Sequence, residues 1–336
     1  MTNKPFTISV VICTRNRADS LAITMECLAN CDRTGIEAEV IVVHNGGEDH
    51  TRAVAESFQD RIPVRYLYEP KMGKHHGLNR AMDSGGLGEI VAVLDDDIIP
   101  AASWFQGVRA SCERWPGRQL FTGHTYVIWP EGEVPKWATN PGPRNWLFSA
   151  PAAGTEDTPL RAGSWYSGCH YWFRASILKS GTRFEEMWLS EANFMLTVVE
   201  QGVQGMTCPD AVAGHRVQPE LLQPEVVLAR TRKWGKCCAA VQLEPFRRTV
   251  PRACMMARRP LAGRVFCLAN CAIWAVRYAF FRVFPPESVY FAERVLALER
   301  TISYLEYFRT ANRLAAYSPW KNRMITDAAP SRSEPA

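Results

Sequence analysis

Short apolar blocks alternate with mixed polar and apolar blocks along the first third of the chain. The apolar blocks are rich in β-branched residues and predict strands, whereas the blocks between them have the spacing of amphipathic helices. This regular β–α alternation predicts a parallel sheet with right-handed crossovers. The predicted strands are 7–13, 39–43, 64–68 and 90–94, and the predicted helices are 19–30 (with Asp19 as its N-cap), 49–58 and 75–83.

The alternation becomes irregular beyond residue 100. A segment rich in Pro, Gly and Trp, 129–161, interrupts it and predicts an ordered binding loop. The first 240 residues are therefore predicted to form one α/β domain, a sheet with flanking helices. Its remaining predicted elements are a helix at 101–112, strands at 120–129 and 168–174, helices at 191–200 and 226–241, and a loop at 218–223.

The most apolar stretch of the chain, 261–284, lies in its C-terminal third. Arg264, Arg277 and Arg282 interrupt it, so the uncharged run 265–276 has twelve residues, too few to span a bilayer. Arginine and aromatic residues beside a short apolar helix suit an interfacial helix lying on a membrane. A core helix of a soluble domain is the alternative.

A second amphipathic helix is predicted at 290–314. Together with the apolar stretch, it predicts a mainly helical, basic and membrane-associated region over 241–325. The last residues, 326–336, are polar and proline-containing and predict a disordered tail.

Composition indicates an ordinary globular protein, with 47% hydrophobic and 22% charged residues. Residues 1–7 are polar and lack the apolar core of a secretory signal. The eleven cysteines show no CxxC spacing. We therefore expect free thiols in a reducing cytoplasm rather than a zinc site.

Positive charge is concentrated in one segment of the chain. The net charge is +5, and residues 216–264 hold eleven Lys and Arg against three Glu. Such a segment favours an anionic surface or substrate. No helix-turn-helix, zinc-finger or RNA-binding signature accompanies it, so a lipid phosphate or anionic membrane is a better partner than nucleic acid. A basic face that is merely solvated is the alternative.

Three consecutive aspartates, Asp95, Asp96 and Asp97, follow the predicted strand 90–94. Carboxylates gathered at a strand end repel one another unless a cation neutralises them, and oxygen ligands suit Mg²⁺ or Mn²⁺. Open α/β sheets also bind their ligands at the carboxyl ends of strands. A solvated turn before a helix is the other interpretation, because Asp is common in turns and at N-caps.

The order of short motifs along the chain resembles glycosyltransferase family 2, whose members transfer sugars from nucleoside diphosphates and have the GT-A fold. The resemblance covers roughly residues 7–240. Asp95-Asp96-Asp97 falls where the family has its metal-binding Asp-x-Asp motif. The other matching segments are 9–17, 42–51, 73–79, 168–174, 184–186 with Glu191, His215, and 230–235.

This resemblance implies a metal-assisted displacement at the anomeric carbon, with inversion of configuration. Asp97, Asp95 and His215 are the expected ligands of Mg²⁺ or Mn²⁺, with Asp95 also a candidate for the ribose or a metal-bound water. Glu191 is the expected general base for an acceptor hydroxyl, with Glu185 and Glu186 as alternatives. The expected contacts to the nucleoside diphosphate-sugar are Thr14, Arg15, Asn16, Arg17, His44, Asn45, Lys74, Asn79, Asp95 and Asp96.

Several positions depart from the family pattern. Ala192 stands where a second carboxylate is usual, His44 replaces an Asp that commonly faces the base, and Leu78 replaces an Arg. Lys74 and the two histidines after it are expected to supply the positive charge instead.

We expect a glycosyltransferase at the cytoplasmic face of the cell membrane, acting on a polyprenyl-linked glycan or another polysaccharide precursor. A degenerate domain that binds or assembles without catalysis is the alternative. A nucleotidyltransferase is disfavoured because residues 13–17, after the first strand, contain no glycine.

Overall fold

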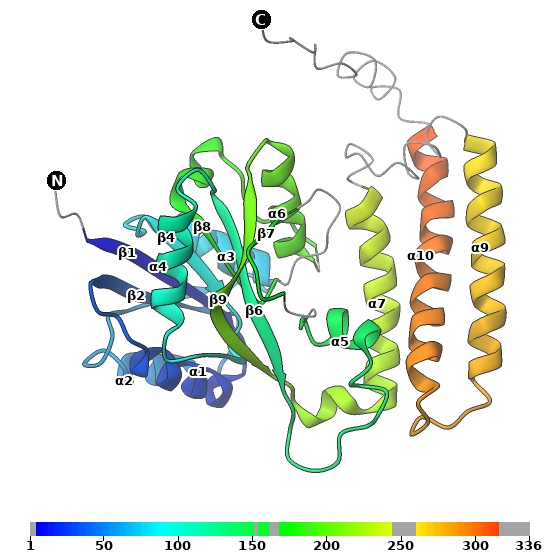
Figure 1. The fold of residues 1–336 in the computed structure, drawn as a ribbon, viewed down its shortest axis with the longest axis horizontal. Coiled ribbons are helices and arrows are strands. Elements are labelled where there is room, and N and C mark those ends of the chain that lie inside the picture. Colours follow the sequence, from blue (N-terminus) through cyan, green and yellow to red (C-terminus); the bar gives the residue numbers. More distant parts are fainter. Residues whose placement is uncertain (1–4, 151–153, 161–167, 188, 244–259, 316–336) are drawn as a thin grey trace, which may run out of the picture.

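The computed structural model describes residues 5–150, 154–160, 168–187, 189–243 and 260–315. Within these residues, nine strands form one mixed sheet, and helices cover both of its faces (Figure 1). The predicted α/β architecture is therefore confirmed. In the order of the sheet, the strands are β3 (Val64–Glu69), β2 (Ile36–Asn45), β1 (Phe6–Thr14), β4 (Ile90–Leu94), β8 (His170–Arg174), β6 (Leu120–Ile128), β9 (Gly205–Arg216) and β5 (Ile98–Pro100), while β7 (Thr158–Pro159) pairs with β9.

The half of the sheet built from β1 to β4 is parallel, as predicted. Successive residues of β1 point to opposite faces, so Val10 and Ile12 pack in one core cluster and Val11 packs in the other. The helices α1 (Ala18–Asn30), α2 (Thr51–Ser57) and α4 (Trp104–Arg114) contribute to the first cluster, and α3 (Lys74–Met82) and α6 (Ser190–Glu200) contribute to the second.

The predicted N-cap of the first helix is wrong. The helix begins at Ala18, which places Arg17 at the N-cap and Asp19 inside the first turn. Arg17 makes no side-chain capping bond, and the backbone N–H of Ala18 donates to Asp49 Oδ2 at 2.9 Å instead. The cap is thus supplied by the loop after β2, which local sequence does not reveal.

The other half of the sheet contains three strands that the sequence pattern did not predict, β5, β7 and β9. β9 pairs parallel with β6, across an irregularity at Gly123 and His124, and antiparallel with β5. The predicted binding loop between β6 and β8 contains a short helix, α5 (Pro141–Leu147). The predicted loop 218–223 contains a short 3₁₀ helix, η2 (Pro219–Leu222), and another 3₁₀ helix, η1 (Ala175–Ser180), follows β8.

Three long helices follow: α7 (Pro224–Leu243), most of which belongs to the predicted domain 1–240, and α9 (Pro260–Phe281) and α10 (Phe291–Ala315), which form the predicted helical C-terminal region. They lie side by side beside the sheet, with α10 between the other two (Figure 1). A third core cluster joins Trp137 and Phe148, from the segment between β6 and β8, to Val227 of α7 and Phe291 of α10. Because α7 runs through the predicted boundary at residue 240, that division stays a prediction, and the predicted tail 326–336 lies outside the described residues.

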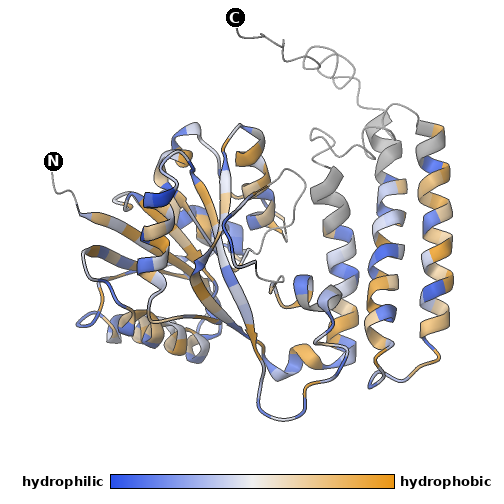
Figure 2. Ribbon diagram, viewed as in Figure 1, coloured by the Kyte–Doolittle hydropathy of each residue, from blue (hydrophilic) through white to orange (hydrophobic). Residues whose placement is uncertain are grey.

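The helix α9 packs against α10 but leaves an apolar side uncovered. Figure 2 shows its hydrophobic residues along most of its length. By length and composition, Arg264–Phe281 is long and apolar enough to cross a membrane, and 6% of this window is buried. The prediction that this stretch is too short to span a bilayer is therefore wrong by this criterion. It counted only the uncharged run 265–276, whereas the helix continues through Arg264 and Arg277. The low burial also argues against a core helix. The exposed apolar residues of α9 and the turn after it are Leu261, Val265, Phe266, Leu268, Ile273, Val276, Phe280 and Val283.

Candidate functional site

The carboxyl ends of β1 and β4 lie next to each other and define the candidate site. The two strands are parallel, and their register pairs Ile12 with Leu94. Thr14, the last residue of β1, is therefore brought next to the aspartates that follow β4. This is the edge of the sheet at which open α/β folds bind ligands.

Protein groups contact both carboxylate oxygens and the backbone carbonyl of Asp96. Thr14 Oγ1 donates to Asp96 Oδ2 at 2.5 Å, and Arg17 Nη1 lies 2.7 Å from Asp96 Oδ1. The backbone carbonyl of Asp96 accepts from the hydroxyls of Ser20 and Thr24 on α1. Burial raises the pKa of Asp96 to about 6, although the charge of Arg17 acts in the opposite direction. In this structure, Asp96 ties β1, β4 and α1 together, and its predicted contact with the donor stays a prediction.

Asp97 is buried like its neighbour but has one oxygen without a hydrogen-bond partner. Arg17 Nη2 donates to Asp97 Oδ2 at 2.8 Å, whereas Oδ1 has no such partner among the described residues. Oδ1 faces Nε2 of His215 at 3.5 Å. Burial acts to raise the pKa of Asp97, but His215 and Arg17 together hold it below its usual range.

His215 is oriented by a backbone carbonyl. Its Nδ1 donates to the carbonyl oxygen of Phe148 at 2.6 Å, because a carbonyl can only accept. In the neutral imidazole, Nε2 then carries the lone pair, and it points toward Asp97 Oδ1. Burial lowers and the Asp97 carboxylate raises the pKa of His215, with a net rise. A lone pair beside an unpartnered carboxylate oxygen fits a divalent cation bound by both groups.

Lys74 joins Asp95, the first aspartate of the triplet, to Glu191. Its ammonium group contacts Asp95 Oδ1 and Glu191 Oε1. The other oxygen of Glu191 accepts from Ser190 Oγ at 2.8 Å. Lys74 is the first residue of α3 and Glu191 lies in the first turn of α6, so the positions of two helices determine this bridge. Glu191 is 7% exposed, and Ala192 beside it is also buried.

Two residues that were predicted to contact the sugar donor hold loops together at the same edge of the sheet. The Asn45 side chain donates to the carbonyl of Lys71 at 2.7 Å and accepts from the N–H of Gly73 at 2.8 Å. The Asn79 amide donates to the carbonyl of Phe184 and accepts from its N–H. Both amides therefore shape the loops around the site, and their predicted contacts with the donor stay untested.

The residues expected near the nucleotide base lie at the ends of β1 and β2. His44 is buried, its Nδ1 is 3.0 Å from the Tyr66 hydroxyl, and its Nε2 is 3.4 Å from Asp49 Oδ1. Arg15 and Asn16 are exposed, and Asn16 has a φ of 53° in the turn after β1. An exposed guanidinium at this position can stack on a planar ring.

The structure brings most of the predicted site residues to one edge of the sheet: Thr14, Arg17, Lys74, Asp95, Asp96, Asp97, Glu191 and His215. Sequence reasoning missed Ser190, Asp49 and the Phe148 carbonyl, each of which orients a predicted residue. It also missed Tyr171, whose buried hydroxyl has no hydrogen-bond partner among the described residues and lies within electrostatic reach of Lys74 and Glu191. Asp49 and Tyr171 lie within the family-like segments 42–51 and 168–174, whereas no local motif marks Ser190 or Phe148. The alternative bases Glu185 and Glu186 are exposed.

The sequence of the first half matches a known family. The family model described as glycosyl transferase family 2 covers residues 9–174. Chondroitin synthase of Escherichia coli is 32% identical over 105 residues, which are 30% of this chain and 14% of that protein. Validoxylamine A glucosyltransferase of Streptomyces hygroscopicus subsp. jinggangensis (strain 5008) is 31% identical over 107 residues, 31% of this chain and 25% of that protein. The chain thus matches a quarter or less of the length of these two relatives.

Solved structures share the fold at low sequence identity. The mannosyltransferase PcManGT from Pyrobaculum calidifontis, in complex with GDP-Man and Mn²⁺, superposes with a TM-score of 0.54 at 18% identity, over 90% of this chain and 88% of that one. GalNAc-T7 with UDP, GalNAc and Mn²⁺ gives a TM-score of 0.51 at 15% identity, over 68% of this chain and 47% of that one. These similarities confirm the predicted GT-A fold. Residues 9–174 of this chain therefore match glycosyl transferase family 2, and they lie within a GT-A fold.

Proposed function

We propose that this chain is a metal-dependent, inverting glycosyltransferase. It transfers a sugar from a nucleoside diphosphate-sugar to a lipid-linked glycan or another polysaccharide precursor. The observation that supports the proposal most is that a candidate metal-binding pair and a candidate general base lie at the same edge of the sheet. Asp97 and His215 present an unpartnered oxygen and a nitrogen lone pair, and the Lys74–Glu191 pair contacts Asp95.

Asp97 and His215 would hold the Mg²⁺ or Mn²⁺ ion, with Asp95 beside them. When bound, the ion would neutralise the charge that develops on the departing diphosphate. Arg17 keeps Asp97 Oδ2 in place and leaves Oδ1 directed at the ion position. Lys74 adds a positive charge close to the same carboxylates.

Glu191 is the group that would accept the proton of the acceptor hydroxyl. Inversion needs a single attack from the face opposite the leaving group, with the base on the attacking side. The Ser190 hydroxyl holds one oxygen of Glu191, and the other is the oxygen that Lys74 contacts. The base is therefore oriented before the acceptor binds.

Donor binding is the test of the proposed activity. A ligand that binds the folded state stabilises it by about 2.7 kcal/mol at one hundred times its dissociation constant. We expect thermal unfolding of the purified protein to shift upward with one nucleoside diphosphate and its sugar in the presence of Mn²⁺. The same shift should disappear with a chelator. No shift with any nucleotide would instead support a non-catalytic domain.

The acceptor side of the proposal depends on the C-terminal helices. The apolar residues of α9 recur at intervals typical of one helical face, and this face is not covered by α10. Arg264 and Arg277 lie on α9 itself, and further basic residues lie on α7, which packs on the other side of α10. An apolar face beside basic residues suits an interfacial helix on an anionic membrane, as at the cytoplasmic face of a cell membrane.

Membrane binding through this face can be measured with lipid vesicles. We expect the wild-type protein to sediment with anionic vesicles and less with neutral ones. The double substitution Ile273→Glu/Val276→Glu should lower the bound fraction at least about tenfold, because each side chain is worth roughly 1.5–3 kcal/mol when buried in an apolar phase. Ile23→Glu, at an exposed apolar residue on α1, is the matched control and should bind like wild type. Equal binding by the double variant would contradict the proposed membrane contact.

A further inference from the structure

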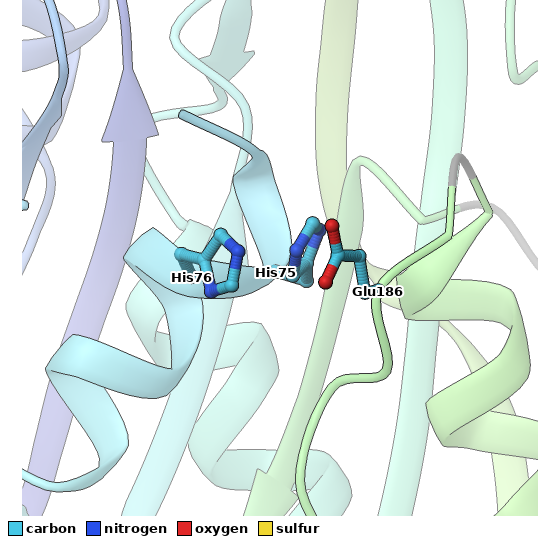
Figure 3. Close-up of side chains that lie close together, drawn as sticks. All are labelled: His75, His76 and Glu186. Atoms are coloured by element: carbon cyan, nitrogen blue, oxygen red, sulfur yellow. The ribbon is translucent and has the colours of Figure 1, made fainter. Parts of the chain in front are cut away.

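Two histidines and a glutamate gather outside the Asp97–His215 pair. His75 and His76 follow Lys74 in the first turn of α3, and Glu186 comes from the loop before α6 (Figure 3). One ring nitrogen of each histidine and one carboxylate oxygen of Glu186 all lie within 4.8 Å of one another. The two imidazole rings are 4.0 Å apart between centroids.

The histidines have unused nitrogens. Nε2 of His75 and Nε2 of His76 are both buried, and neither has a hydrogen-bond partner among the described residues. His75 is 8% exposed. A buried polar atom without a partner is costly, so two of them side by side point to a ligand that would use their lone pairs.

We propose that His75, His76 and Glu186 form a transition-metal site of the Zn²⁺ class. Two imidazoles and one carboxylate are donors that select zinc and similar ions over Mg²⁺. A tetrahedral ion with bonds of about 2.0–2.1 Å leaves its fourth position to water when three protein ligands are present. Glu186 is exposed, and its ion pair with Lys71 Nζ is long, at 3.9 Å. Its carboxylate is therefore not held in place and is able to move closer to the two histidine nitrogens.

This site uses other residues than the ion position proposed for catalysis, and it offers two imidazoles and one carboxylate where that position offers one imidazole beside aspartates. Its place in the fold links α3 to the loop that ends at α6. Asn79 already joins these two elements through the backbone of Phe184, two residues before Glu186. A bound ion would add a second connection and fix the loop that leads to Glu191. The inference does not depend on the proposed transfer reaction.

Zinc content measures this site directly. Purified protein is dialysed against low-micromolar Zn²⁺ with Mg²⁺ in excess, and bound zinc is counted by mass spectrometry of the metal. We expect His76→Asn to bind one zinc fewer per chain than wild type, and Glu186→Gln to bind that zinc at least about tenfold more weakly. His50→Asn, at an exposed histidine paired with Asp19, is the matched control and should keep the wild-type number.

Two results would overturn the proposal. One is equal zinc content in wild type, His76→Asn and Glu186→Gln. The other is loss of the same zinc in Asp97→Asn, which would place the ion at the catalytic position. Because Glu186 is an exposed residue of a loop, Glu186→Gln is expected to fold, and its unfolding temperature without zinc should match that of wild type.

Discussion

Replacing Asp97 by alanine is expected to lower the rate of sugar transfer by at least about a thousandfold, which corresponds to about 4 kcal/mol in the barrier. The reason is that Asp97 Oδ1 is a buried carboxylate oxygen without a hydrogen-bond partner among the described residues, directed toward His215 Nε2. Removing it takes away a charged ligand of the ion that stabilises the departing diphosphate. The substitution should also abolish the Mn²⁺-dependent thermal shift with donor.

A second pair of variants separates metal binding from folding. Asp97→Asn preserves the shape of the side chain, and its Mn²⁺ affinity should fall as strongly as its activity. Asp96→Asn is the matched control in the same triplet, because both Asp96 oxygens are taken by Thr14 and Arg17. It is expected to lower the unfolding temperature and to leave the Mn²⁺ affinity close to wild type. Near-normal turnover of folded Asp97→Ala would overturn the metal assignment.

Replacing Glu191 by glutamine is expected to lower kcat by about 10²–10⁴, the usual contribution of a positioned general base. Glutamine keeps the size of the side chain and can still accept from Ser190 Oγ, but it cannot take a proton from an acceptor hydroxyl. Donor binding does not need this proton transfer. The donor-induced thermal shift should therefore persist while turnover is lost.

Glu185→Gln is the matched control for this substitution. Glu185 was an alternative base in the sequence analysis, and the structure finds it exposed on the loop before α6. Its removal should leave kcat within a few-fold of wild type. If Glu185→Gln were inactive and Glu191→Gln active, the base would be assigned to the loop and the role of Glu191 would be limited to its contact with Lys74.

The parallel half of the fold was predictable because its strands are continuous apolar runs. Ile90–Leu94 is buried at every position, so its sequence has the pattern of a central strand. β9 was missed for the opposite reason: Pro209 and Asp210 interrupt it in the middle, and the register shift opposite β6 breaks its period. Pairing with β6 and β5, distant in sequence, determines this strand.

The site was predictable in its members but not in their individual contacts. The sequence alone does not distinguish the roles of Asp96 and Asp97, because they are identical neighbouring residues of one triplet. Thr14 and Arg17 bind both oxygens of Asp96, whereas the end of β9 brings His215 to Asp97. Likewise, Glu186 is far from His75 in the sequence, and only the loop before α6 brings the two together. Spacing along the chain contains no information on such encounters.

The double contact of Lys74 determines the state of the resting enzyme. An ammonium group that contacts Asp95 and Glu191 together occupies the Glu191 oxygen that the Ser190 hydroxyl leaves open. We expect the diphosphate of an arriving donor to compete for the same ammonium group. We expect its arrival to release Glu191 for the acceptor, so that the donor binds first and the acceptor second.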